Sequence, residues 1–144
     1  AGFAVMTGGY AGVMGAASKG AAESGGHVIG VTTKAIEALR GPEIQANEWL
    51  VENVRYDTLH DRLMHLVRDA EGYVIMPGGL GTLTELAMVW ELMRVRDIPK
   101  RPIICYGTYW RDMLANLHES PYVRQTDWAL FTFANSPQDV VEAL

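Results

Sequence analysis

The sequence is poor in cysteine and in clustered positive charge, and it contains no long apolar run. Cys105 is the single cysteine, so no internal disulfide can form, and a lone thiol suits a reducing cytosol. No apolar run approaches the ~20 residues that a membrane-spanning helix needs. The net charge of −5 at pH 7 argues against a nucleic-acid partner, because counterion release requires clustered Lys and Arg. We therefore expect a cytoplasmic protein that binds neither membranes nor nucleic acids, whereas a small anionic ligand is compatible with the composition.

Several signatures of catalysis and metal binding are also absent. Neither glycine-rich turn ends in Gly-Lys-Ser/Thr, which excludes a kinase-like phosphate loop. His60 and His65 are five residues apart, a spacing that places them on different faces of a helix, so we predict no metal site. Ser18 and Ser24 lack a nucleophile elbow, which leaves acyl transfer without support. Cys105 lies in the apolar run PIICY and is expected to be inert, because apolar surroundings suppress the reactive thiolate.

The 144 residues are most simply one domain, residues 1–144, long enough to bury a proper core. The expected strands are residues 2–7, 27–32, 49–56, 73–76, 102–107 and 130–133. The expected helices end at Ser24, begin at Asp57 or Thr58, run from Thr82 to about Val95, cover residues 108–120 and begin at Ser136. Residues 33–48 are expected to form a surface loop that contains one helical turn at most. This order predicts the α/β class, with an open parallel sheet that binds ligands at the carboxyl ends of its strands. Both glycine turns lie at such ends, so we expect one crevice to contain both.

The central turn lies in YVIMPGGLGTLTE, residues 73–85. The run 73–76 is apolar without alternation, as in a strand covered on both faces, and Pro77 ends it. Three glycines let the backbone adopt positive φ and approach a ligand closely: Gly78, Gly79 and Gly81. Thr82 is expected to open a helix whose free N–H groups attract phosphate. Glu85 lies one helical turn after the last of these glycines, so its carboxylate can point back toward a ligand.

The first glycine turn, TGGYAGVMG at residues 7–15, follows the first expected strand. It resembles a dinucleotide fingerprint in which Thr7 takes the place of the first glycine. A dinucleotide-binding enzyme also needs an acidic residue at the end of the following strand to hold the ribose hydroxyls. That position contains Thr32, Thr33 and Lys34, so the sequence argues against NAD as a ligand.

Two further features carry alternative interpretations. Arg62 stands fifteen residues before Pro77, and on spacing alone we read it as a solvated residue in a local ion pair, worth ~0.3 to 0.5 kcal/mol. A role in chemistry is the alternative. The helix from Thr82 to Val95 carries a broad apolar stripe that includes Trp90. The stripe is too broad for one sheet contact, so it predicts a homodimer interface on this helix that completes the site.

The two turns together resemble a known family. PGGLGTLTE, residues 77–85, matches the PGGxGTxxE motif of the LOG ("lonely guy") family, also called lysine decarboxylase-like proteins. TGGYAGVMG is similar to the family's GGGxxGLMG turn, and Arg62 lies where the family has its catalytic arginine. The resemblance covers nearly the whole chain. It implies a Rossmann-like homodimer, without a cofactor, that hydrolyses nucleoside 5′-monophosphates, cytokinin ribotides included, to free base and ribose 5-phosphate.

The resemblance makes Arg62 and Glu85 the expected catalytic residues. Glu85 would meet the ribose hydroxyls and stabilise the positive charge that develops on the sugar, or position the attacking water. Arg62 would orient Glu85 or help to discharge the leaving base. The 5′-phosphate of an AMP-like ligand would be held by the central turn, namely Gly78, Gly79, Gly81 and Thr82. The base and ribose would be lined by the first turn, namely Gly8, Gly9, Gly12 and Met14.

Three departures from the family pattern affect these expectations. The family has a further strand and helix before the segment that begins here at Ala1, so either the sequence is a fragment or the site is incomplete. Leu63 stands where a Lys commonly follows the arginine, and Thr7 replaces the first glycine of the GGG turn. The alternative function is therefore a nucleotide-binding carrier without catalysis, such as the molybdenum-cofactor carrier proteins that resemble this family.

Overall fold

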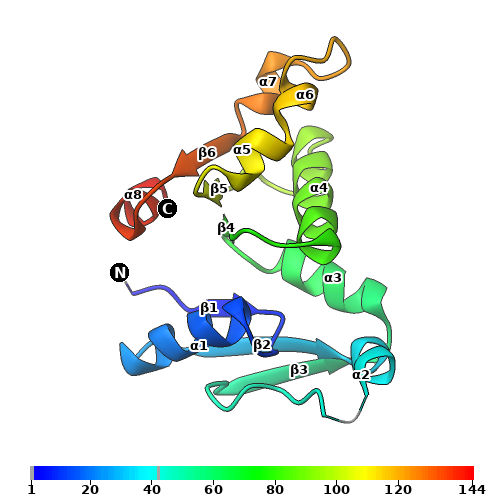
Figure 1. Ribbon diagram of the computed structural model, residues 1–144, viewed down its shortest axis with the longest axis vertical. Coiled ribbons are helices and arrows are strands. Elements are labelled where there is room, and N and C mark those ends of the chain that lie inside the picture. Colours follow the sequence, from blue (N-terminus) through cyan, green and yellow to red (C-terminus); the bar gives the residue numbers. More distant parts are fainter. Residues whose placement is uncertain (1, 42) are drawn as a thin grey trace. The chain divides into compact units, whose positions relative to one another are not determined.

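The computed structural model describes residues 2–41 and 43–144 of the chain. The chain divides into two compact units, Ala1–Ala70 and Glu71–Leu144, which we term unit 1 and unit 2. Each unit contains a three-stranded parallel sheet with helices packed against it (Figure 1). The α/β class and the parallel strands expected from the sequence are confirmed. The expectation of a single domain stays a prediction.

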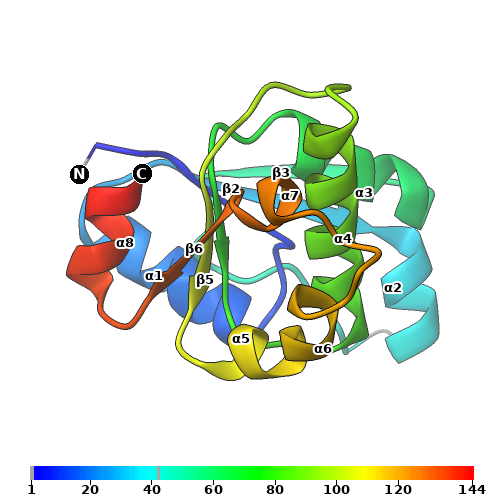
Figure 2. The ribbon, with the colours of Figure 1, turned by 90° about the horizontal axis from the view of Figure 1, so that it is seen from above.

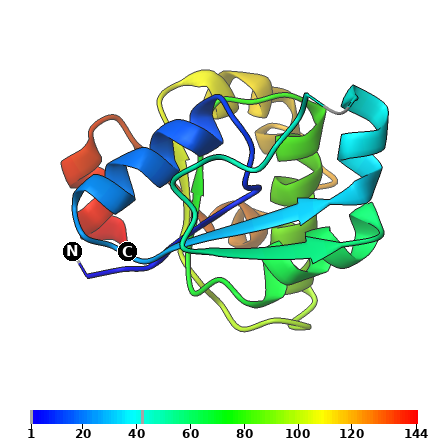
Figure 3. The ribbon, with the colours of Figure 1, turned by 90° about the horizontal axis from the view of Figure 1, so that it is seen from below.

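Unit 1 alternates strands and helices along the chain. Its elements are β1 (Val5–Thr7), α1 (Val13–Glu23), β2 (Val28–Thr33), α2 (Lys34–Arg40), β3 (Glu52–Tyr56) and α3 (Leu59–Arg68). The strands lie in the order β1–β2–β3, and β2 and β3 run side by side in the same direction (Figure 3). Helix α1 packs on β1 and β2, and α3 packs on β2 and β3. Parallel pairing places the carboxyl ends of all three strands at one edge of the sheet.

The stretch expected to be a surface loop, residues 33–48, contains the helix α2. Thr33 caps this helix, because its side chain accepts a hydrogen bond from a backbone N–H of the first turn. Arg55 of β3 donates two hydrogen bonds to Glu37 of α2, which lowers the pKa of that carboxyl. The prediction of one helical turn at most is therefore too short, since α2 has seven residues. The cap and the contact with β3 could not be recognised in the apolar periodicity of the segment.

Unit 2 continues the alternation. Its elements are β4 (Tyr73–Ile75), α4 (Leu80–Arg94), β5 (Ile103–Tyr106), α5 (Tyr109–Met113), α6 (Ala115–His118), α7 (Gln125–Trp128), β6 (Phe131–Ala134) and α8 (Pro137–Ala143). The strand order is β4–β5–β6, and α4 and α8 lie on opposite sides of β5 and β6 (Figure 2). The central strand β5 is the core of the unit, since Ile103, Ile104 and Cys105 have no exposed surface.

Several boundaries in unit 2 differ from the sequence-based expectation. Helix α4 begins at Leu80, two residues before Thr82. The single helix expected over residues 108–120 is divided into α5 and α6 at Leu114, and α7 was not expected. The strand at 73–76 is not covered on both faces, because Val74 is 41% exposed. In the described residues, 2–41 and 43–144, every helix is too short or too polar to span a membrane.

The broad apolar stripe of α4 finds partners within unit 2. The Trp90 ring lies 4.8 Å from the Phe131 ring and 6.1 Å from the Trp128 ring, between ring centroids. The indole N–H of Trp90 donates to the Asp127 carbonyl at 2.8 Å. These contacts account for the breadth of the stripe without a second protomer, so the homodimer stays a prediction.

Candidate functional site

The most specific motif of the sequence forms the amino end of α4. Gly79 is the N-cap of this helix, and no side chain caps its first turn. The first helical hydrogen bond joins the Leu83 N–H to the Gly79 carbonyl at 3.0 Å. Among the described residues, none accepts a hydrogen bond from the preceding backbone N–H groups, those of Leu80, Gly81 and Thr82. With the positive end of the helix dipole, these donors make an arrangement suited to an anion.

The three glycines of this turn do not adopt the positive φ that the sequence predicted. A Cβ at Gly78 would lie 2.9 Å from the Thr82 Cβ, so only glycine lets the Thr82 side chain fold back over the turn. Gly79 and Gly81 are exposed, and a Cβ at either position would meet no atom within 4 Å. These two glycines are therefore not required by positive φ or by a close neighbour. Their lack of a side chain leaves the backbone of the first turn of α4 exposed.

Glu85 lies on the same face of α4 as Gly81, because residues four apart in a helix stand one above the other. Helical side chains lean toward the amino end, so the Glu85 carboxylate is directed toward the first turn. The residue is half-buried. The helix thus places Glu85 one turn from the last glycine of the motif, as the sequence indicated.

The first glycine turn joins β1 to α1 in unit 1. Gly9 has φ of 79°, and a Cβ there would lie 2.7 Å from Cγ2 of Thr32. Gly12, the N-cap of α1, has φ of 77°. Thr7 replaces the family's first glycine without a conflict, because its Oγ1 accepts a hydrogen bond from the Gly9 N–H at 3.1 Å. Positive φ is thus required in this turn, although it is not used in the central one.

Arg62 is buried against the first glycine turn. Thr58 caps α3, and Arg62 follows four residues later in this helix. The Arg62 side chain is 6% exposed, and its Nε donates a hydrogen bond to the Val31 carbonyl at 2.9 Å. Its guanidinium fills the space beside Gly8, and Met14 Sδ lies at the same position, 2.6 Å from where a Cβ of residue 8 would be. The interpretation of Arg62 as a solvated surface residue is therefore wrong, because the side chain is buried and its guanidinium is hydrogen-bonded to the backbone.

The residue after Arg62 belongs to the hydrophobic core. Leu63 is only 9% exposed, and it lies on α3, which packs on β2 and β3. The family's usual Lys would have to bury its ammonium here or reorient, at a considerable desolvation cost. The departure at this position therefore has a structural explanation in unit 1.

Asn47, in the connection between α2 and β3, holds the first glycine turn and was not singled out from the sequence. Its backbone N–H donates to the Gly9 carbonyl at 2.8 Å. Its side-chain amide donates to the Tyr10 carbonyl at 3.2 Å and to Ser18 Oγ at 3.3 Å. No sequence signal indicates this role, because the partners lie between 29 and 38 residues away along the chain.

The side chain of Tyr10, a residue of the first glycine turn, reaches the carboxyl end of β2. A dinucleotide-binding protein has its acidic residue at this position. The Tyr10 side chain is 2% exposed, and its hydroxyl donates to the Thr33 carbonyl at 3.1 Å and accepts from the Thr33 N–H at 2.9 Å. The last residue of β2 is Thr33, and the buried Tyr10 hydroxyl is hydrogen-bonded to both its backbone N–H and its carbonyl. This arrangement strengthens the argument against NAD.

Two aromatic residues of α5 contact the central turn, and neither was singled out from the sequence. The Tyr109 hydroxyl donates to the Gly78 carbonyl at 3.0 Å, and the Trp110 indole N–H donates to the Met76 carbonyl at 3.0 Å. Tyr109 is 42% exposed, whereas Trp110 is completely buried. The amphipathic pattern of residues 108–120 indicated a helix but contained no signal for hydrogen bonds to a loop about thirty residues earlier.

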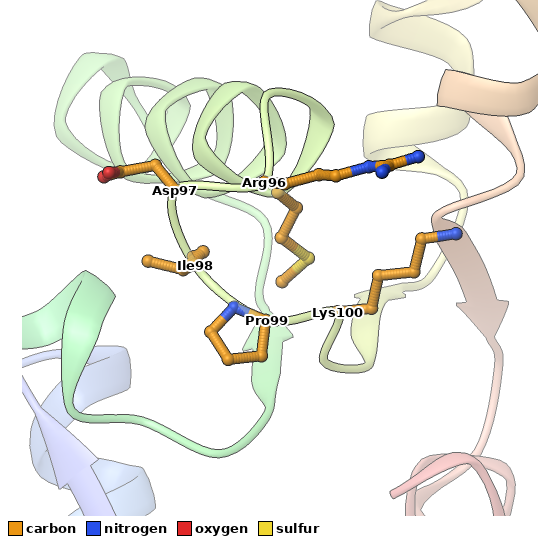
Figure 4. Close-up of a pocket in the computed structure, with 6 residues that line it drawn as sticks. Arg96, Asp97, Ile98, Pro99 and Lys100 are labelled. Atoms are coloured by element: carbon orange, nitrogen blue, oxygen red, sulfur yellow. The ribbon is translucent and has the colours of Figure 1, made fainter.

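A hollow of about 440 Å³ lies at the other end of α4. It is lined by Met93 and the residues that follow the helix, and Arg96 and Lys100 extend to the same side of it (Figure 4). The fifteen residues of α4 separate it from the central turn by about 22 Å, at about 1.5 Å per residue. No residue of either glycine turn lines this hollow. We therefore do not associate it with the candidate site.

The predicted site residues gather in two groups, one in each unit. Unit 1 brings Arg62 together with Gly8 and Met14, next to Gly9 and Gly12. Unit 2 brings Gly78, Gly79, Gly81 and Thr82 together at the start of the helix that contains Glu85.

The chain matches the model of a protein family described as "Possible lysine decarboxylase" over residues 14–144. It is 28% identical, over 97% of its length, to "Probable cytokinin riboside 5'-monophosphate phosphoribohydrolase LOGL2" of Oryza sativa subsp. japonica. It is 27% identical, also over 97% of its length, to "Cytokinin riboside 5'-monophosphate phosphoribohydrolase LOG5" of Arabidopsis thaliana. The chain spans 57% and 61%, respectively, of the length of these relatives.

A similar solved structure is that of the molybdenum cofactor binding protein from the phototrophic bacterium Rippkaea orientalis. The TM-score is 0.71, the identity is 22%, and the likeness covers 97% of this chain and 74% of that chain. At this identity the likeness shows a common fold.

Proposed function

Because the chain belongs to the family described as "Possible lysine decarboxylase", the LOG family, we propose that it is a phosphoribohydrolase of nucleoside 5′-monophosphates. AMP or a cytokinin ribotide would be cleaved to free base and ribose 5-phosphate. Two relatives are named as phosphoribohydrolases, one of them as a probable one, and both names give cytokinin riboside 5′-monophosphate as the substrate. The observation that carries the proposal is the uncapped amino end of α4, where open backbone donors precede Glu85 by one helical turn.

In this proposal the amino end of α4 binds the 5′-phosphate. The backbone N–H groups of Leu80, Gly81 and Thr82 point out of the helix end, and the dipole favours a dianion there. The uncovered glycines let phosphate oxygens approach the backbone closely. Leu80 joins the phosphate-binding residues expected from the sequence, because the helix begins two residues earlier than Thr82.

Glu85 acts on the ribose. In N-glycosidic hydrolysis the C1′–N bond breaks and its electron pair leaves with the base. A water oxygen bonds to C1′ and loses one proton, and the departing base nitrogen takes up one proton. Positive charge develops on the sugar before the water attacks, and a carboxylate stabilises that charge or orients the water. Arg62 supplies positive charge and N–H donors beside Gly8, and its role is to stabilise the negative charge that leaves with the base.

The direct test is product analysis with AMP and a cytokinin ribotide, in which free base and ribose 5-phosphate are quantified. Glu85→Gln keeps the shape of the side chain and removes its charge, so kcat is expected to fall by at least about 100-fold. Glu91→Gln is the matched control, since Glu91 lies on the same helix and pairs with Arg94 on the surface. Free base released at the same rate by Glu85→Gln and by the unaltered protein would rule out the role given to Glu85.

A carrier without catalysis is the second candidate function. It is favoured by the common fold with a molybdenum cofactor binding protein and by the core leucine at position 63. A carrier would bind AMP or the cofactor tightly and release no free base over hours. Calorimetric titration alongside the product assay separates the two functions.

We propose in addition that the protein forms a homodimer through α4. Two apolar residues at the ends of α4 are exposed: Leu80, its first residue, is 80% exposed, and Val95, its C-cap, is 51% exposed. Burial of such apolar surface favours association. Light scattering is expected to give twice the mass of the chain, and a monomer at assay concentration would contradict the dimer.

A further inference from the structure

The peptide between Gly78 and Gly79 is the part of the central turn that is hardest to hold in one orientation. A peptide flanked by two glycines has the widest choice of backbone angles, so its plane can rotate at little steric cost. In the structure the Tyr109 hydroxyl donates a hydrogen bond to the carbonyl of this peptide, that of Gly78, at 3.0 Å. The neighbouring residue Trp110, fully buried, donates to the Met76 carbonyl and anchors α5 to the end of β4.

The orientation of this carbonyl determines the direction of a ligand-binding donor. The peptide is trans, so the Gly78 C=O and the Gly79 N–H point in opposite directions. Because the carbonyl faces Tyr109, the Gly79 N–H faces away from α5. Gly79 is the N-cap, and its N–H precedes the open donors of the first turn of α4.

We propose that Tyr109 is a positioning residue of the phosphate-binding turn. Its hydroxyl fixes the Gly78–Gly79 peptide so that the Gly79 N–H is directed to the phosphate together with the first-turn donors of α4. Without the hydroxyl, this peptide samples other orientations, and the phosphate loses one donor for part of the time. This inference rests on the proposed function in one respect, that the ligand is a nucleoside monophosphate whose phosphate binds at the central turn.

Tyr109→Phe tests this role, because it removes one oxygen and retains the ring, which stacks edge-on against Trp110 at 5.0 Å between ring centroids. Tyr122→Phe is the matched control, since Tyr122 is 94% exposed and lies outside the central turn. Dissociation constants are measured by calorimetry for AMP and for adenosine, and thermal unfolding is recorded for each variant. Inorganic phosphate, titrated as a competitor of AMP, reports on the turn by itself.

The Kd of AMP is expected to rise about two- to tenfold in Tyr109→Phe, the range for loss of one neutral hydrogen bond. The Kd of adenosine is expected to stay the same, and the inhibition constant of inorganic phosphate is expected to rise by the same factor as that for AMP. In turnover, KM for AMP rises while kcat at saturation is retained. Tyr122→Phe is expected to change none of these quantities.

Unchanged AMP affinity in Tyr109→Phe would overturn the positioning role. An equal loss of affinity for AMP and for adenosine would also overturn it, because such a loss indicates a general distortion of the binding site. The outcome is independent of catalysis. If the unaltered protein binds AMP but releases no base, the proposed hydrolase function fails, and the ratio of the two Kd values still decides the role of Tyr109. If the unaltered protein binds neither AMP nor phosphate, both proposals are overturned.

Discussion

The guanidinium of Arg62 occupies the space beside Gly8 that a side chain at position 8 would need. The arginine is held there by the hydrogen bond from its Nε to the Val31 carbonyl, at 2.9 Å. A residue of α3 thus forms part of the first glycine turn, although 54 positions separate the two residues in the sequence. The glycine is required by the arginine, rather than by its own backbone angles.

Gly8→Ala is expected to displace Arg62 and to reduce hydrolysis of AMP. The added methyl group overpacks the turn against both the guanidinium and Met14 Sδ, with a loss of about 1–3 kcal/mol of unfolding free energy. Gly20→Ala is the control, because Gly20 lies in α1 with no atom within 4 Å of an added Cβ, and this variant is expected to gain about 0.5–1 kcal/mol. Urea unfolding and the base-release assay measure both effects. Full activity of Gly8→Ala would contradict the importance of the Arg62 position.

Asn47→Asp is expected to loosen the first glycine turn. The carboxylate cannot donate to the Tyr10 carbonyl or to Ser18 Oγ, and it brings one oxygen against another. The loss of unfolding free energy is expected to be about 1–3 kcal/mol, as for buried polar groups that lose a partner. Asn116→Asp makes the same chemical change at an exposed position of α6 and is expected to have little effect. Chemical denaturation of the two variants side by side gives the comparison.

Cys105 is expected to resist alkylation in the folded protein. It is completely buried in β5, and burial raises the pKa of its thiol from 9.0 to about 11. Iodoacetamide at pH 8.5 is therefore expected to modify the protein only after urea is added, as followed by mass spectrometry. Rapid modification without denaturant would contradict the burial of this strand.

The same shift of the Cys105 pKa predicts how stability changes in alkali. Below about pH 9 the thiol is neutral in both the folded and the unfolded chain, so it contributes no pH dependence. Between about pH 9 and 11 the unfolded chain ionises first, and the unfolding free energy falls as the pH rises. Cys105→Ala is expected to show a shallower decline over this interval in urea titrations.

Arg96→Gly is expected to stabilise the protein. Arg96 follows the last turn of α4 with φ of 65°, a left-handed conformation that is unfavourable for residues with a Cβ. The hydrogen bonds there, from the Arg96 N–H to the Met93 carbonyl and from the Asp97 N–H to the Leu92 carbonyl, are those of a helix end that normally contains glycine. The gain is expected to be about 0.5–1 kcal/mol. Lys100→Gly, in the same connection between α4 and β5, is the control. It is expected to leave the midpoint of urea unfolding no higher than that of the unaltered protein.

The local elements of the fold could largely be predicted from the sequence. The apolar run at Tyr73 forms β4, the last helix begins at Ser136 as expected, and Thr58 caps α3. These features depend on residues a few positions apart, which a sequence displays directly. Only one turn of helix α2 was predicted, because a contact with the distant Arg55 contributes to holding the rest of it.

The candidate site divides in the same way. The sequence indicated the PGGLGTLTE motif, and Glu85 lies one turn beyond its last glycine. It predicted positive φ for the glycines of this motif, and that prediction is wrong. Gly78 makes room for Thr82, whereas Gly9 and Gly12 adopt positive φ, and this distinction depends on the neighbours that each glycine meets in three dimensions.

The sequence by itself determined the strand–turn–helix order, the two glycine turns and the family, because these are patterns of neighbouring residues. Only the tertiary structure decided which side chains hold the turns: Arg62 beside Gly8, Asn47 on the Gly9–Tyr10 backbone and Tyr109 on Gly78. Each of these contacts joins residues about thirty or more positions apart. Hydrogen bonds over such separations follow from the packing of helices on parallel sheets, and neither periodicity nor motif spacing specifies which atoms will meet.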